Sequence, residues 1–439
     1  MLRSFRVANH KSIRDEQELV LLPAYDKSRP VVPVAAIFGA NASGKSNLLD
    51  SMAWLKSAVL DSYGRWQPGS GVPRRRFALE LESGGRPTSF DVDVVMDGVR
   101  YVYRLTVNSR AVVEEHLTSY PNGRPRAIFR RKDDELVFGS TVPEARSLTN
   151  VLSRLTRDNA LLLSVAAAND VEEVQQPYQW FQADCAVATA PYTVVAEDDL
   201  ARQLTGSAGA ILDGLIKAAD LGIKDIEVSP KPSIDVLAVG KANEADHLAV
   251  TAVVGGRRYE LVASDEDGVK SLLHWLSEDA SSGRVVFRHG RGEATLGLLD
   301  ESAGTQSWIN LVVHALDVIQ RGGVLLVDEV DASLHPHLTA RLVNLFRDEE
   351  TNPKLAQLIF TTHDATLLDD EVLSRDEVWF MEKDSESGAS RLYPLTDFHP
   401  RKNENTEGRY LAGSYGAVPR LADHRFRAAL RRGKRSDAA

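Results

Sequence analysis

Two motifs late in the chain constrain its fold more than any other feature. ESAGTQ, which contains Ser302, has the pattern of a helix start, and VLLVDE, from Val324 to Glu329, is a short apolar run that ends in two carboxylates. The Gly322-Gly323 pair between them predicts a tight turn into a buried strand. The interval from Ser302 to Asp328 therefore predicts a helix followed directly by a buried strand.

GANASGKS, from Gly39 to Ser46, matches the G-x-x-x-x-G-K-[ST] phosphate-binding pattern. It follows the apolar run VVPVAAIF and precedes apolar residues at helical spacing, so the strand–loop–helix context of such loops is present. Backbone amides of such a loop surround phosphate oxygens, Lys45 reaches the β- and γ-phosphates, and Ser46 offers its hydroxyl to Mg²⁺. The predicted nucleotide-binding residues of this loop are Gly39, Asn41, Ala42, Ser43, Gly44, Lys45, Ser46 and Asn47.

Two apolar strands end in residues that suit phosphate chemistry. Asp328 is placed to hold the magnesium shell, and Glu329 can orient and deprotonate a water molecule. LIFTTHD is a second apolar strand, and an imidazole at its end, His363, can hydrogen-bond a γ-phosphate. The predicted catalytic residues are Lys45, Glu329 and His363, and the predicted metal ligands are Ser46 and Asp328.

DESAGTQSW predicts a helix start that could bind an anion. Ser302 would present a hydroxyl and Gly304 a bare backbone amide at the helix N-terminus. By itself the string could be an ordinary helix cap. Together with the other three motifs it indicates a second phosphate-binding surface. The apolar face of this helix is predicted to contain Trp308, Leu311, Val312, Ala315 and Ile319.

The composition excludes several classes of protein. A formal net charge of -10 excludes a uniformly basic protein that coats nucleic acid, although a local basic patch is compatible with it. The single cysteine, Cys185, excludes an intramolecular disulfide and a thiolate zinc site, and the lack of a cleavable leader predicts a cytoplasmic location. The longest apolar runs are shorter than the roughly 20 residues that span a bilayer, so no membrane association is expected. Pro336 between His335 and His337 predicts a helix start rather than a metal site.

Changes of pattern divide the chain into four segments. Residues 1–143 contain the phosphate loop and hairpin-like strands with turn signals such as MDGVR and PNGRP. Residues 144–225 lose the period of two and carry helical stretches, which predicts an inserted helical lobe. Strands and helices alternate again within 226–420. Residues 421–439 form a basic tail, for which a solvated terminus is a better interpretation than a nucleic-acid arm.

A set of motifs along most of the chain resembles the soluble ATP-binding-cassette (ABC) ATPases, which are related to the SMC chromosome proteins. The set is NHKSI, FGANASGKSNLL, LLSVAAAN, ESAGTQ, LLVDEVDASLHP, FTTHD and GRYLAGSYGAVP. Within that group the chain is most similar to stand-alone ATPases of bacterial phage-defence loci, such as the ATPase subunit of PARIS (phage anti-restriction-induced system). The resemblance implies an α/β fold, the ABC-type P-loop NTPase fold, with a mixed sheet, an antiparallel β-subdomain and an inserted, mainly helical lobe.

The resemblance also implies roles for particular residues. Ser302 and Gly304 would contact the γ-phosphate bound by the opposite protomer, and Asp331 would link the two sites. Lys11 and Ser12 would lie near the nucleotide. The ESAGTQ segment, which corresponds to the signature motif of ABC ATPases, has one glycine where ABC transporters have two, and this agrees with a resemblance to the soluble ABC ATPases. The glutamine that joins the magnesium site to the inserted lobe has no clear counterpart, and the nearest polar candidates are Asn169, Gln175 and Gln176.

The implied function is Mg²⁺-dependent hydrolysis of ATP to ADP and phosphate by a homodimer or larger even-numbered homo-oligomer. Such a dimer would act as a switch or sensor in anti-phage defence and control a separate effector, such as a TOPRIM-type nuclease, without requiring nucleic acid. The alternative is an SMC-like or repair-like DNA-binding clamp, which would need a basic channel and long coiled-coil arms. A small-molecule kinase would give no role to ESAGTQ or Glu329.

Overall fold

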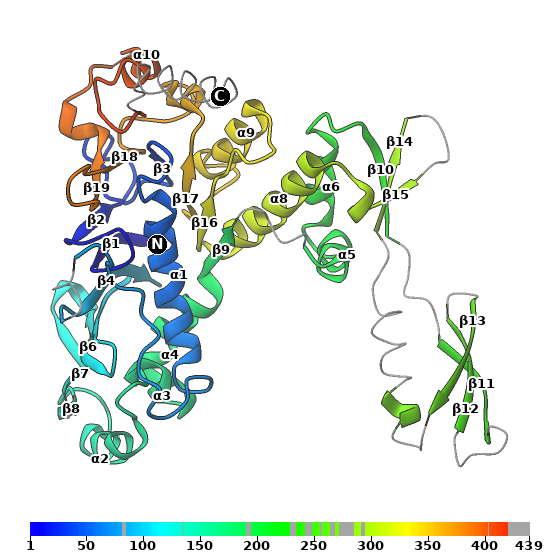
Figure 1. The fold of residues 1–439 in the computed structure, drawn as a ribbon, viewed down its shortest axis with the longest axis horizontal. Coiled ribbons are helices and arrows are strands. Elements are labelled where there is room, and N and C mark those ends of the chain that lie inside the picture. Colours follow the sequence, from blue (N-terminus) through cyan, green and yellow to red (C-terminus); the bar gives the residue numbers. More distant parts are fainter. Residues whose placement is uncertain are drawn as a thin grey trace, which may run out of the picture. The chain divides into compact units, whose positions relative to one another are not determined.

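A computed structural model shows a chain made of two compact units (Figure 1). The structure describes residues 1–80, 85–133, 135–189, 195–228, 234–241, 248–254, 257–263, 268–271, 285–290, 295–402 and 404–419. The first unit comprises Met1–Val187, Arg321–Asp331 and Val343–Ala439, and the second comprises Ala188–Gln320 and Ala332–Leu342. The predicted basic tail lies outside the described residues.

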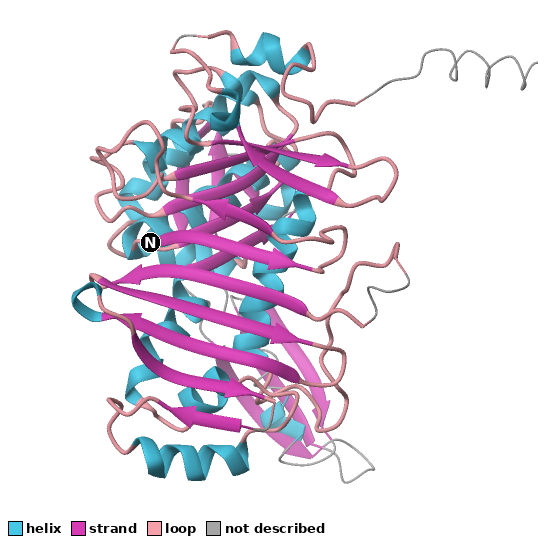
Figure 2. Ribbon diagram, turned by 90° about the vertical axis from the view of Figure 1, so that its left-hand side faces the viewer, coloured by secondary structure: helices cyan, strands magenta, loops and turns pink. Residues whose placement is uncertain are grey.

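The first unit contains a seven-stranded antiparallel sheet, drawn in magenta in Figure 2. Its strands, in spatial order, are β2 (Gln17–Val20), β1 (Leu2–Ala8), β4 (Thr88–Met96), β5 (Val99–Val107), β6 (Val112–Tyr120), β7 (Arg126–Lys132) and β8 (Glu135–Phe138). The β4–β5 hairpin turns at Asp97 and Gly98, which both have positive φ, as a tight two-residue hairpin requires. The hairpins predicted at MDGVR and PNGRP are therefore confirmed, whereas the turn predicted at SGGRP lies partly outside the described residues.

A second, mixed sheet in this chain carries the ends of the predicted motif strands. Its order is β19 (Ser390–Pro394), β18 (Val378–Lys383), β3 (Val34–Phe38), β17 (Gln357–Thr362), β16 (Val324–Asp328) and β9 (Cys185–Thr189). The four strands from β18 to β16 are parallel, and β19 pairs antiparallel with β18. Every residue of β3 and β17 is buried, which explains why β3 is apolar throughout and why β17 contains the apolar run Leu358–Phe360. The carboxyl ends of β3, β16 and β17 consequently meet at one edge of the sheet.

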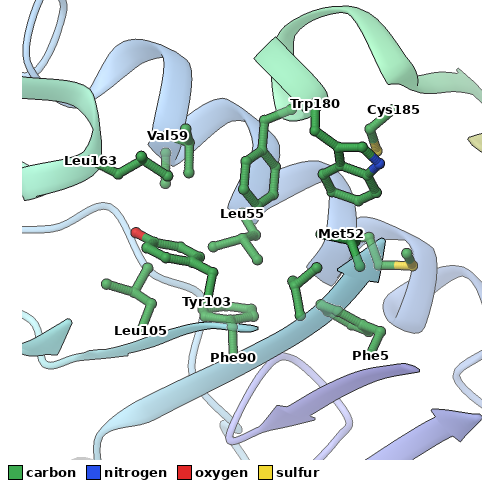
Figure 3. Packing of buried hydrophobic residues seen from close by; sticks show 14 of the residues in the cluster. Phe5, Met52, Leu55, Val59, Phe90, Tyr103, Leu105, Leu163, Trp180 and Cys185 are labelled. Carbon is green, nitrogen blue, oxygen red and sulfur yellow. The ribbon is translucent and has the colours of Figure 1, made fainter. Parts of the chain in front are cut away.

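Helix α1 (Lys45–Asp61) shares one apolar core with both sheets of the first unit. Its residues Leu48, Met52, Leu55 and Val59 are buried, as their spacing predicts. Figure 3 shows Met52, Leu55 and Val59 among side chains from the antiparallel sheet and from the helices that follow it. Because the phosphate loop leads directly into α1, this packing positions the loop.

Three further helices belong to the first unit: α2 (Ala145–Leu155), α3 (Leu162–Ala168) and α4 (Glu172–Gln179), the last followed by a π-helical turn, Trp180–Asp184. The buried carboxylate of Glu115 accepts hydrogen bonds from the Leu162 and Leu163 amides, at 2.6 and 2.8 Å, and from the Tyr103 hydroxyl, at 2.9 Å. Glu115 therefore attaches α3 to the antiparallel sheet. Helices form within the predicted segment 144–225, from α2 to α6 (Gly209–Lys217), but its assignment as one inserted helical lobe stays a prediction.

The second unit contains helices and two small antiparallel sheets. The helices are α5 (Glu197–Thr205), α6 (Gly209–Lys217) and most of α8 (Ala303–Arg321). The sheets are β10 (Ile223–Val228), β14 (Val285–His289) and β15 (Thr295–Gly297), and β11 (Ile234–Lys241), β12 (Leu248–Val254) and β13 (Arg257–Ala263). The Trp308 indole donates to the Leu215 carbonyl at 3.2 Å, and the predicted apolar face of α8 is buried.

The remaining elements complete the chain. Pro336 is the first residue of α9 (Pro336–Arg347), as predicted, and α10 (Thr406–Leu411) follows the mixed sheet. The short 3-10 helices are Pro121–Gly123, Leu298–Asp300, Ala365–Leu368 and Leu395–Phe398. Within the described residues, no helix combines the length and the hydropathy that crossing a bilayer requires.

Candidate nucleotide site

Two glycines of the phosphate loop occupy positions that leave no room for a side chain. Gly44 has a φ of +109°, in the left-handed region that a side chain rarely adopts. A Cβ added at Gly39 would lie 2.3 Å from the Met381 carbonyl oxygen, and one added at Gly44 would lie 2.1 Å from the Ser390 hydroxyl oxygen. Both glycines are therefore required for the loop to pack against the β18–β19 hairpin.

The loop fits a phosphate group. The N-terminus of α1 has no side-chain cap, so its first backbone amides stay available to an anion. The Ser43 hydroxyl is buried and makes no hydrogen bond within the protein. Asn41, Ala42 and Ser46 are exposed. The Ser43 hydroxyl is thus a buried donor that a phosphate oxygen could satisfy.

Lys45 is held against its own loop. Its ammonium donates to the carbonyls of Gly39, at 2.9 Å, and Ala40, at 3.3 Å, and lies 3.1 Å from Nε2 of His363. Burial lowers the pKa of Lys45 to about 8, although the nearby carboxylates of Asp328, Glu329 and Asp331 act to raise it. The ammonium is therefore mostly charged at neutral pH and is surrounded by the predicted catalytic residues.

A threonine on the neighbouring strand bonds to both acidic residues at the end of β16. The Thr361 hydroxyl donates to Oδ1 of Asp328 at 2.6 Å and accepts from the Glu329 amide at 2.7 Å. Thr361 is fully buried, whereas the Glu329 side chain is exposed and its backbone has a φ of +51°. Asp328 and Glu329 are thus held by one hydroxyl, with Glu329 directed out of the sheet. Oxygen ligands such as Asp328 and Ser46 are those that Mg²⁺ prefers.

His363 follows β17 and joins this group. Its amide points at both carboxylate oxygens of Asp331, at 3.3 and 3.4 Å. Burial and the charge of Lys45 lower the pKa of the imidazole below its ordinary 6.5, so the ring is neutral at pH 7. Because an ammonium can only donate, Nε2 of His363 accepts from Lys45. The structure therefore brings Lys45, Asp328, Glu329, Asp331 and His363 together.

Lys11 and Ser12 lie in the turn after β1 and contact the start of α1. The Lys11 ammonium is 2.7 Å from Oδ1 of Asp50, and Nε2 of His10 is 2.7 Å from Oδ2. Burial acts to raise the pKa of Asp50, but the hydrogen bonds from His10 and Lys11 outweigh it and lower the pKa to about 2. Ser12 accepts a hydrogen bond from the Asn47 amide group at 2.6 Å. Both predicted residues thus support α1, and their contact with a nucleotide stays a prediction.

Ser302 and Gly304 belong to the second unit. Oγ of Ser302 accepts from the Thr305 amide at 3.2 Å and lies 2.9 Å from the Thr305 hydroxyl. A Cβ added at Gly304 would lie 2.9 Å from the Ser333 carbonyl oxygen. The helix-cap interpretation of Ser302 is therefore correct within the protomer. Whether the same residues also bind phosphate stays a prediction.

A family model described as "AAA domain, putative AbiEii toxin, Type IV TA system" matches residues 34–369. The chain belongs to this family. The matched range contains the phosphate loop, both carboxylates and His363, and it excludes Ser12 and Ser390. No curated protein matches the chain. Among solved structures, it is similar to an SMC head bound to the C-terminal winged-helix domain of ScpA, with 12% sequence identity, a TM-score of 0.35, and coverage of 91% of this chain and 99% of that one.

Several residues of this AAA-domain protein were not predicted from its sequence. Thr361 and Ser390 both contact the site, and the only sequence signal for Thr361 is its position two residues before His363. The three candidates for the missing glutamine make other contacts. Asn169 and Gln175 donate to carbonyls of α3, and Gln176 bonds to Asp97 and Tyr101 of the antiparallel sheet.

Strand β9 was also missed, although it is the neighbour of β16 in the sheet. Its sequence, CAVAT, is short and carries no turn signal, so periodicity alone could not identify it. His335 and His337 stack with their ring centroids 5.1 Å apart. In the described part of the chain, no group of three or more His, Cys, Asp or Glu side chains is arranged to hold a metal ion.

Proposed function

We propose that this protein binds ATP with Mg²⁺ and hydrolyses it to ADP and phosphate. The observation that carries the proposal is the convergence of Lys45, Asp328, Glu329 and His363 beside a glycine loop in which the buried Ser43 hydroxyl has no hydrogen-bond partner within the protein. Membership in an AAA-domain family supports the same activity.

The side chains divide the chemistry between them. Lys45 would donate to the β- and γ-phosphates, and Glu329 would accept the proton of the attacking water as its oxygen bonds to the γ-phosphorus and the bond to ADP breaks. Magnesium, held by Ser46 and Asp328, would neutralise the phosphate charge. Neutral His363 would hydrogen-bond the γ-phosphate oxygens, and Asp331 keeps its backbone in place.

We further propose that the active form is a homodimer or larger even-numbered homo-oligomer, in which Ser302 and Gly304 of one protomer contact the γ-phosphate bound by another. ATP would then hold the protomers together, and hydrolysis would release them. The family description names a toxin of a toxin–antitoxin system. We propose in addition that the switch acts in bacterial anti-phage defence and controls a separate effector, such as a TOPRIM-type nuclease; this part of the proposal rests on the resemblance of the sequence motifs.

Glu329→Gln tests the activity and the assembly together. The variant loses the general base but keeps the phosphate loop, so we expect ATP binding to persist and turnover to fall by about 10³-fold. With ATP and Mg²⁺, its mass in solution should be that of a dimer or larger even-numbered oligomer. Glu350→Gln, at an exposed glutamate, is the matched control and should hydrolyse ATP normally.

Two outcomes would contradict the proposal. A Glu329→Gln variant that stays monomeric with ATP argues against the dimeric switch, and unchanged turnover argues against the assigned base. Salt-sensitive stimulation of the wild-type protein by DNA would instead favour the clamp.

A further inference from the structure

Three side chains, those of Asn47, Ser12 and Ser390, and the Ser43 backbone carbonyl are connected in a chain by hydrogen bonds beside the phosphate loop. The Asn47 amide group lies 2.6 Å from Oγ of Ser12, which lies 2.7 Å from Oγ of Ser390, which lies 2.6 Å from the Ser43 carbonyl oxygen. Asn47 and Ser43 flank Gly44 in the loop and the first turn of α1. The two serines come from outside the loop: Ser12 from the turn after β1, and Ser390 from the start of β19.

The direction of this chain follows from its two ends. The Asn47 amide nitrogen can only donate, and the Ser43 carbonyl can only accept. Ser12 accepts from Asn47, and the Ser390 hydroxyl is directed at both Oγ of Ser12 and the Ser43 carbonyl, so its single hydrogen is shared between these two acceptors. Removing either hydroxyl therefore leaves the chain broken, with no alternative arrangement of the remaining hydrogens that restores it.

Burial makes the chain costly to break. Ser390 is 3% exposed and Ser43 is also 3% exposed, so water cannot easily replace a lost partner. A second, backbone hydrogen bond joins the same elements, from the Ser390 amide to the Ser12 carbonyl at 2.8 Å. The Ser390 hydroxyl also occupies the space beside Gly44, where a Cβ would lie 2.1 Å away. The loop, the N-terminal turn and the C-terminal hairpin thus meet at Ser390.

We propose that Ser12 and Ser390 are positioning residues that hold the phosphate loop in the conformation that receives ATP. The inference rests on the proposed ATP binding and adds two residues that lie outside the matched range 34–369. Neither residue needs to touch the nucleotide for this role. Their effect is transmitted through Ser43 and Asn47, which border the left-handed Gly44. The site is therefore completed by segments from both ends of the sequence.

The role predicts a particular kinetic signature for Ser390→Ala. A loosened loop binds the ground state and the transition state less well by the same amount, so KM for ATP rises while kcat stays constant. Loss of one buried hydrogen bond and exposure of its partner predicts a KM and a Kd for ATP about 10-fold higher. Ser12→Ala should show the same change, because it breaks the same link, and Ser12→Thr, which keeps the hydroxyl at a half-buried position, should restore wild-type affinity.

A double-mutant cycle separates the proposal from a general packing effect. If the serines act as one chain, Ser12→Ala/Ser390→Ala should weaken ATP binding no more than either single change. Ser387→Ala is the matched control, since its hydroxyl donates to Asp384 and accepts from the Ala389 amide within the turn of the same hairpin. ATP affinity of that control should equal that of the wild type. Melting curves measured without ATP identify any variant that fails to fold. If Ser390→Ala does not fold, the ATP affinity of Ser12→Ala tests the proposal.

The outcomes distinguish this inference from the proposed function. Wild-type protein that binds no ATP contradicts the proposed function itself. Wild-type protein that binds ATP, with Ser390→Ala and Ser12→Ala binding equally well, contradicts only the positioning role. Strictly additive losses in the double variant, or a fall in kcat without a rise in KM, would likewise overturn it.

Discussion

Helices α1 and α8 both begin at a motif that suits an anion, but their N-termini differ. The first turn of α1 follows Gly44 and has no side-chain cap, and the buried Ser43 hydroxyl beside it makes no hydrogen bond within the protein. The first turn of α8 is closed by its own residue, because Ser302 accepts from the Thr305 amide. One helix start is open to a ligand, and the other is already satisfied.

The difference suggests different roles in ATP binding. An open helix start, braced by Ser12 and Ser390, can bind phosphate without rearrangement. At α8 the Ser302 hydroxyl would have to share or give up its hydrogen bond with the Thr305 amide in order to contact a phosphate. Phosphate binding at α8 by itself would therefore be weaker than at α1. We therefore expect α1 to determine ATP affinity and α8 to act only once ATP is bound.

The strongest test mixes two inactive variants. Lys45→Ala removes the phosphate contact at α1, and Ser302→Asp places a negative charge at α8, so each homodimer should be inactive. In a mixed dimer, the intact phosphate loop of the Ser302→Asp protomer would face the intact Ser302 and Gly304 of the Lys45→Ala protomer. We expect ATPase activity to reappear at least about 10-fold above either variant alone, measured by phosphate release. No recovery would mean that α1 and α8 do not act across a dimer.

Ser302→Asp and Ser302→Ala separate the cap from phosphate contact. Aspartate caps helices well, so its variant should keep the wild-type melting temperature, whereas alanine should cost about 1 kcal/mol of stability. If Ser302 meets a phosphate, the aspartate variant should lose about 100-fold in turnover through charge repulsion while ATP affinity hardly changes. Normal turnover in Ser302→Asp would assign Ser302 to capping alone.

A smaller effect on turnover is expected at Thr361, which bonds to the Asp328 carboxylate and to the Glu329 amide. Thr361→Val keeps the shape but removes the hydroxyl that holds Asp328 and the Glu329 amide. We expect kcat to fall about 10-fold, with ATP affinity within about twofold of wild type, because one buried hydrogen-bonding group is lost. Thr361→Ser retains the hydroxyl and should stay near wild-type activity. Equal kcat values for the valine and serine variants would remove Thr361 from the site.

The smallest effect concerns the support of α1 by Asp50. Its pKa is about 2 in the folded protein, below the ordinary 3.8, so its contribution to stability is present above pH 3.8 and is lost as pH falls toward 2. Asp50→Asn should be less stable than wild type at pH 5, and the difference should shrink toward pH 2. Denaturant unfolding at the two pH values measures this. A constant difference would show that the carboxylate charge is not what braces the helix.

Regular periodicity made some elements predictable. β3 is apolar throughout, and β16 and β17 contain the apolar runs Val324–Val327 and Leu358–Phe360, because these strands are buried in the sheet. Helix α1 shows its buried face at helical spacing. β9 was not identified because five residues contain too little pattern. Helices α2 to α4 belong to the first unit through contacts, such as those of Glu115, that local sequence does not encode.

The sequence alone determined the phosphate loop, the strands that end at it and the carboxylates after β16, because each depends on local residue order. Tertiary structure decided which distant residues complete the site. Thr361 holds Asp328 and Glu329, and Ser12 and Ser390 meet at Gly44, through hydrogen bonds between segments that are far apart in the chain. A serine in a strand has no sequence pattern that reveals its partner. Only the folded sheet places its hydroxyl beside the loop.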